Sequence, residues 1–80
     1  MNNNMQLTKP NYVFREQEQL PVGKVKLKIV SGHAWVFTEE GNFIMHTGEE
    51  CTINTDDNAP RIRSAYARGV VHYDYSWSSN

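Results

Sequence analysis

Residues Val25 to Ile53 read VKLKIVSGHAWVFTEEGNFIMHTGEECTI and carry the strongest structural pattern in the chain. It contains three apolar runs, which are separated by Gly32, Gly41 and Gly48. In the first run apolar residues alternate with lysines, so an extended segment has one apolar side and one cationic side. The stretch therefore predicts consecutive β-strands that are joined by tight turns.

Two of these strands form a predicted hairpin, and its register decides which side chains reach the core. A three-residue loop over 39–41, with its glycine in the left-handed conformation, joins strands over 34–38 and 43–46. This register places the largest side chains on one face, and we expect that face to pack in the core. They are Trp35, Phe37 and Phe43. A two-residue loop is the alternative, and it shifts the pairing by one residue and mixes the faces.

The rest of the chain adds strands and no helix. Residues 61–67 and 70–75 have the composition of two further strands, and no stretch of ten residues has a helical period. We predict an all-β fold, a small barrel or sandwich of about six or seven antiparallel strands. We expect one domain over 12–77, a disordered arm over the polar residues 1–11, and a tail over 78–80.

Composition excludes several classes of protein. The net charge is −1, which argues against a nucleic-acid partner, because phosphate contacts need a basic excess. The one cysteine, Cys51, excludes an intramolecular disulfide, and we expect it to be a buried structural thiol. No apolar run approaches the roughly 20 residues of a membrane span, so we expect a soluble cytoplasmic protein without a membrane partner. Because 80 residues bury only a thin core, we expect a homodimer or a larger homo-oligomer.

The order IVSG, AWVFT, EEG, FIMHT and GEECTI resembles the strand and glycine pattern of the cupins over about Val25 to Ala65. At this length the chain is similar to a minimal or half cupin. It is also similar to small bacterial domains of unknown function that have a G-x-x-W strand followed by Thr, although GHAWVFT carries an extra residue before the Thr. The resemblance implies a β-sandwich barrel.

Cupin enzymes hold a metal with two His and a Glu from a first motif and a His from a second. The aligned positions here are Val25 for the Glu, residues 19–21 for the His pair, and Ala59 for the last His. None of them retains a ligand, so the resemblance implies a cupin-like scaffold without its metal site and without a cofactor.

Three histidines, His33, His46 and His72, are candidates for a different metal site, with Cys51. Their spacing matches no common ligand signature, and the preferred hairpin register places His33 and His46 on opposite faces. We therefore expect no metal site. Convergence of the three would favour a metal-dependent cupin-type enzyme, such as an isomerase or a dioxygenase.

Aromatic and arginine side chains are the remaining candidates for function, because they bury area or donate planar hydrogen bonds at binding sites. For a small polar ligand we expect a site formed by Trp35, His46, Arg61, Arg63 and Tyr73. For a homo-oligomer interface we expect Tyr75 and Trp77. The sequence thus favours a non-catalytic binding or interaction module that self-associates. The alternatives are the metal-dependent enzyme and a carbohydrate-binding module that uses Trp35, Tyr73 or Trp77.

Overall fold

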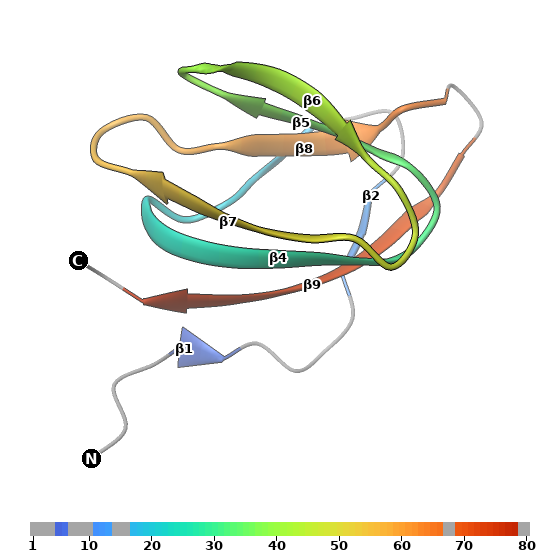
Figure 1. The fold of residues 1–80 in the computed structure, drawn as a ribbon, viewed down its shortest axis with the longest axis horizontal. Coiled ribbons are helices and arrows are strands. Elements are labelled where there is room, and N and C mark those ends of the chain that lie inside the picture. The colour runs from blue at the N-terminus through green and yellow to red at the C-terminus, as the bar shows by residue number, and fades with distance from the viewer. Residues whose placement is uncertain (1–4, 7–10, 14–16, 67–68, 79–80) are drawn as a thin grey trace.

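The computed structural model describes residues 5–6, 11–13, 17–66 and 69–78, which form two antiparallel sheets stacked as a β-sandwich (Figure 1). The first sheet has the order β1, β9, β4, β7, with β2 also paired to β9. Its strands are β1 (Met5–Gln6), β2 (Asn11–Val13), β4 (Gly23–Ser31), β7 (Glu50–Thr55) and β9 (Val71–Ser78). The second sheet has the order β3, β8, β5, β6. Its strands are β3 (Glu18–Gln19), β5 (Ala34–Thr38), β6 (Gly41–Met45) and β8 (Arg61–Ser64).

The all-β prediction is confirmed, since the described residues form strands and no helix. They form nine strands, six of which have four or more residues, in line with the six or seven predicted. The additional ones are β1, β2 and β3, which have only two or three residues and therefore show no alternation in the sequence. Within the arm expected over 1–11, β1 and the first residue of β2 pair with β9. The rest of that arm, and residues 79–80 of the tail, lie outside the described residues.

The alternation predicted for the first sheet is confirmed. In β4 the apolar residues are buried and the lysines are exposed, and β7 alternates in the same way. Because β4 lies between β7 and β9, its apolar side chains fill the middle of the sandwich. The core consists of Leu20, Val25, Leu27, Ile29, Ala34, Val36, Met45, Ile53, Ile62, Val71 and Tyr73.

The preferred hairpin register is wrong by one residue. Val36 pairs with Phe43, and Thr38 pairs with Gly41, which leaves a two-residue turn. The Thr38 hydroxyl closes this turn by donating to the Gly41 carbonyl at 2.9 Å and accepting the Glu40 N–H at 3.2 Å. Gly41 has a φ of 144°, which residues with a side chain rarely adopt.

The expected aromatic core is therefore wrong as well. Ala34 and Val36 face the first sheet and are fully buried, so their neighbours Trp35 and Phe37 lie on the outer face of β5. Phe43 is 39% exposed. Aliphatic side chains make up most of the core between the sheets, together with Tyr73. Only alternate residues of β5 point into this space.

Candidate functional site

The outer face of the second sheet carries two aromatic residues and two arginines that are close together. Trp35 pairs with Arg63, and Phe37 pairs with Arg61, on the neighbouring strands β5 and β8. Cross-strand partners share a face, so these four side chains form a block of two rings and two guanidinium groups. We call the block and its flanking residues the outer face; they are Trp35, Phe37, Arg61, Arg63, Asn42, Ile44 and Gln19.

Contacts within the outer face hold the Trp35 indole in place. The rings of Trp35 and Phe37 are stacked, with centroids 5.0 Å apart and planes at 28°. The guanidinium carbon of Arg63 lies 5.7 Å from the Trp35 ring centroid, within the range of a cation–π contact. The indole N–H donates to Asn42 Oδ1 at 3.0 Å. These contacts immobilise the indole before any ligand binds, which lowers the entropy cost of binding.

Arg63 carries a donor that its surroundings do not satisfy. Its Nε is buried and has no hydrogen-bond partner among the described residues. A buried donor without a partner is rare in folded proteins, and it often marks a place where a ligand or water completes the bonding. Arg63 therefore places a positive charge, and a donor without a partner among the described residues, beside the Trp35 ring.

A hollow with a volume of about 470 Å³ adjoins the Phe37 end of the outer face. Its lining combines one aromatic ring with amide, carboxylate, hydroxyl and guanidinium groups: Gln19, Phe37, Thr38, Glu39, Asp57, Asn58, Ala59 and Arg61. The amide nitrogen of Asn58 donates to Glu39 Oε2 at 3.2 Å, which links the 56–58 loop to the β5–β6 turn. Such a lining suits a ligand with many hydroxyl groups and one apolar face.

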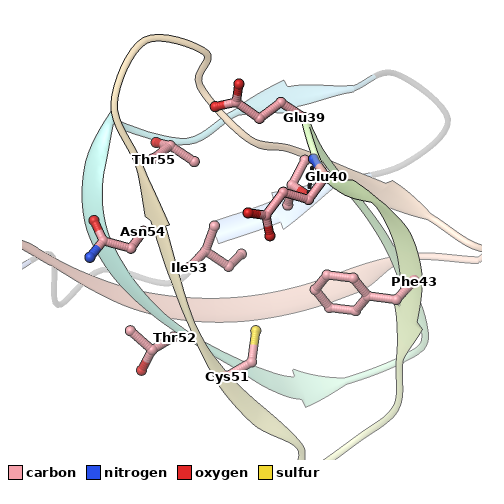
Figure 2. Close-up of a pocket in the computed structure, with 9 residues that line it drawn as sticks. Glu39, Glu40, Phe43, Cys51, Thr52, Ile53, Asn54 and Thr55 are labelled. Carbon is pink, nitrogen blue, oxygen red and sulfur yellow. Dashed lines mark hydrogen bonds between the residues drawn. The ribbon is translucent and has the colours of Figure 1, made fainter.

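A second, smaller cavity of about 170 Å³ lies where the sandwich opens between β6 and β7 (Figure 2). Phe43 of β6 and Cys51 of β7 both line it. The Cys51 thiol donates to Met45 Sδ at 3.5 Å, and burial raises the pKa of the Cys51 thiol. Since the thiolate is the nucleophilic form, this cysteine is poorly suited to covalent catalysis.

His46 does not belong to the outer face. It lies at one end of the sandwich, where its Nδ1 is 2.8 Å from Nδ1 of His33. The expectation that these two histidines lie on opposite faces was wrong, because it rested on the three-residue loop. No group of three or more His, Cys, Asp or Glu side chains among the described residues is arranged to hold a metal.

The other predicted residues lie on the first sheet. Tyr73 is 3% exposed and belongs to the core, so it does not reach a surface ligand. Tyr75 and Trp77 are half-buried and pack against the core, and the Trp77 indole N–H donates to the Val22 carbonyl at 2.6 Å. The structure therefore brings together only three of the predicted site residues, which are Trp35, Arg61 and Arg63.

Sequence reasoning missed Phe37 as a surface residue and Asn58 as part of a site. The signal for Phe37 was Thr38 directly before Glu-Glu-Gly, because a hydroxyl at that position can close a two-residue turn. Asn58 had no such signal, since its contact with Glu39 spans 19 residues of sequence.

Two of the positions that align with the ligands of the cupin metal site face the core. Leu20 and Val25 are both buried among apolar side chains. No helix in the described part of the chain has the length and apolarity needed to cross a bilayer. Comparisons of the chain with protein-family models, with curated proteins and with solved structures gave no match, so the cupin-like relationship stays a prediction.

Proposed function

We propose that this protein is a non-catalytic binding module that holds a carbohydrate against the outer face of the second sheet. The observation that supports the proposal is the stacked pair of Trp35 and Phe37 beside a hollow lined by Asn58, Asp57 and Arg61. A sugar ring presents an apolar face, which packs on an aromatic ring, and a rim of hydroxyl groups, which bond to amide, carboxylate and guanidinium groups.

The charge on the outer face supports a ligand rather than self-association through this face. Two copies packed by the same surface would bring Arg61 and Arg63 of one copy toward those of the other. Like charges that face each other across an interface oppose its formation. A carboxylate-bearing sugar would instead accept hydrogen bonds from these guanidinium groups, so we expect acidic oligosaccharides to bind more tightly than neutral ones.

The test is calorimetric titration of the protein with a panel of neutral and uronic-acid oligosaccharides. Phe37→Ala is expected to weaken binding about tenfold, which corresponds to ~1.4 kcal/mol. Tyr66→Ala is the matched control, because Tyr66 is an aromatic residue that is 59% exposed and does not line the hollow. Amide chemical shifts that change on β5 and β8 would support the site. The proposal fails if no oligosaccharide binds, or if Phe37→Ala binds as tightly as the unmodified protein.

We also propose that the protein self-associates through the free edge of β6. This strand ends the second sheet, and its sequence, GNFIM, contains neither a charge nor a proline. Phe43 and Ile44 on it are 39% and 51% exposed. Natural edge strands are usually protected by charges, prolines or short length, so this unprotected edge suits pairing with a second copy. Antiparallel pairing of β6 with itself would give a two-fold dimer with an eight-stranded sheet.

Light scattering with size-exclusion chromatography tests the dimer. Ile44→Lys is expected to give a monomer, because it adds a positive charge from each copy to the paired edge. Thr52→Lys is the matched control, because Thr52 is exposed on β7, the edge strand of the first sheet. An unmodified protein that stays monomeric at high concentration would rule out this interface.

We also propose a cytoplasmic location for the protein, because the free thiol of Cys51 is typical of a reducing compartment.

A further inference from the structure

We propose that the cavity between β6 and β7 binds a small organic cation, a primary ammonium ion with a short apolar body. The cavity has a volume of about 170 Å³ and lies where the edge strands of the two sheets face each other (Figure 2). It is distinct from the hollow beside Phe37, although Thr38 and Glu39 contribute to the lining of both. Glu40 and Phe43, on which the binding of a cation depends, line only the cavity.

Apolar side chains from both edge strands form the floor of the cavity. Phe43 of β6 pairs with Val36, and Ile53 of β7 pairs with Val25; both partners are fully buried. Cross-strand partners share a face of their sheet, so Phe43 and Ile53 point between the sheets. Figure 2 shows the side chains of Phe43, Cys51 and Ile53 directed into the same space. Phe43 is still 39% exposed, so an apolar group bound here would remove part of its ring from water.

The charge of the lining favours a cation. Glu39 and Glu40 both line the cavity, and its lining in the described part of the chain contains no Lys, Arg or His. The Glu39 carboxylate accepts a hydrogen bond from the Asn58 amide at 3.2 Å. The Glu40 carboxylate has no hydrogen bond or ion pair with any described residue, and Figure 2 shows it reaching over the space between β6 and β7. Glu40 is therefore the carboxylate that is free to pair with a bound cation.

A carboxylate and an aromatic ring at one cavity recognise an ammonium ion through two different interactions. The carboxylate accepts charge-assisted N–H bonds, and the face of the ring attracts the cation through its quadrupole. An anionic ligand would instead meet the charges of Glu39 and Glu40 without a compensating cation. A metal ion is a poorer match, because no group of three or more His, Cys, Asp or Glu side chains among the described residues is arranged to hold one.

The volume limits the apolar body of the ligand to about one ring. An enclosed apolar cavity of about 150 Å³ holds one benzene molecule. The cavity between β6 and β7, at about 170 Å³, is of similar size. An amine with one ring, or with a short alkyl chain, can thus place its apolar body on the floor and its ammonium group beside Glu40.

The test is a titration of the protein with 2-phenylethylamine, followed by amide chemical shifts. Two compounds of the same shape are the ligand controls: neutral 2-phenylethanol and anionic 3-phenylpropionate. We expect the amine to bind about fivefold more tightly than the alcohol and the carboxylate to bind most weakly, because only the amine gains from the charge of the lining. Shifts are expected over residues 38–43 and 51–55, which contain the lining. Saturating amine is also expected to slow the alkylation of Cys51 by iodoacetamide, since Cys51 lies on the floor.

Glu40→Gln tests the charge without changing the shape of the side chain. It is expected to weaken binding of the amine about threefold to fivefold and to leave binding of the alcohol unchanged. Glu50→Gln is the matched control, because Glu50 is an exposed acid on β7 that does not line the cavity. Phe37→Ala is expected to leave the affinity for the amine unchanged, so failure of the carbohydrate site and failure of the cavity are distinguishable.

Comparison of the three compounds on the unmodified protein decides the question even where a variant fails to fold. The proposal is overturned if the amine binds no more tightly than the alcohol or if saturating amine leaves the alkylation rate of Cys51 unchanged. It is also overturned if Glu40→Gln and Glu50→Gln bind the amine equally well.

Discussion

At the scale of single residues, Gly32 and Gly48 show how two similar backbone conformations differ in their surroundings. Gly32 has a φ of 93°, and a Cβ built there lies 2.5 Å from the Val70 carbonyl oxygen. Gly48 has a φ of 88°, and a Cβ built there meets nothing within 4 Å. Both positions disfavour a side chain, but only Gly32 also lies against the backbone of the β8–β9 connection.

Gly32→Ala is expected to lower the free energy of unfolding by about 2–4 kcal/mol, since it adds a collision to the backbone strain. Gly48→Ala is the matched control and is expected to lower it by about 1–2 kcal/mol, from strain alone. Urea denaturation of the three proteins measures both changes. Equal losses for the two variants would show that the collision with Val70 is relieved at no cost.

Because of Tyr73, we expect the free energy of unfolding to depend on pH in the alkaline range. Burial, with smaller contributions from Glu18 and Tyr75, raises the pKa of Tyr73 from 10.0 to about 12. Below pH 10 the phenol is neutral in both states and its stabilising contribution is complete. As pH rises from 10 to 12 the unfolded chain loses this proton first, so stability falls by up to ~1.4 kcal/mol per pH unit. Tyr73→Phe is expected to lack this part of the fall when unfolding is measured by urea between pH 8 and 12. Parallel curves for the two proteins would contradict the prediction.

At the scale of elements, β4 organises the first sheet, because it pairs with β7 on one side and β9 on the other. Its side chains alternate between the core and solvent over its first seven residues. The pairing with β9 changes register between Ile29 and Ser31, where a bulge ends the regular alternation. The chain then turns at Gly32 into the second sheet.

Leu27 and Lys26 are neighbours on β4 with opposite surroundings, so truncation of each reports one face of the strand. Leu27→Ala is expected to lower the free energy of unfolding by about 2–5 kcal/mol, because Leu27 is fully buried. Lys26→Ala is expected to change it by about 0.5 kcal/mol or less, because Lys26 is exposed. Thermal and urea unfolding measure both. A small effect of Leu27→Ala would mean that the core collapses around the cavity.

For the molecule as a whole, the side of the sandwich between β6 and β7 contains a cavity and an unpaired strand edge. The edge strands β6 and β7 belong to different sheets, and a cavity opens between them (Figure 2). The same side carries the free edge of β6, through which we propose that two copies pair. Cys51 lies at this opening and reports whether the sheets separate there.

Cys51 is expected to react with iodoacetamide about tenfold or more slowly than glutathione at pH 8, since burial raises its thiol pKa and limits access. Urea above the unfolding midpoint is expected to abolish the difference. The measurement is the alkylation rate followed by mass spectrometry. A rate in the folded protein equal to that of glutathione would show that the two edge strands separate readily.

The fold class follows from local sequence, because the alternation of apolar and polar residues becomes two faces in any extended chain. The lysines of β4 lie on the exposed side as predicted. The placement of Arg61 and Arg63 on one side of β8 followed from the same period of two. None of these inferences needed the position of any other strand.

The register of β5 with β6, in contrast, depends on packing between the sheets. A slip of one residue exchanges the two faces of a strand, and the local sequence allowed both loop lengths. The difference came from the space that the first sheet leaves for Ala34 and Val36, which are fully buried. That choice placed Trp35 and Phe37 beside Arg63 on the surface and brought His33 to His46, because contacts across strands depend on pairing rather than on spacing along the chain.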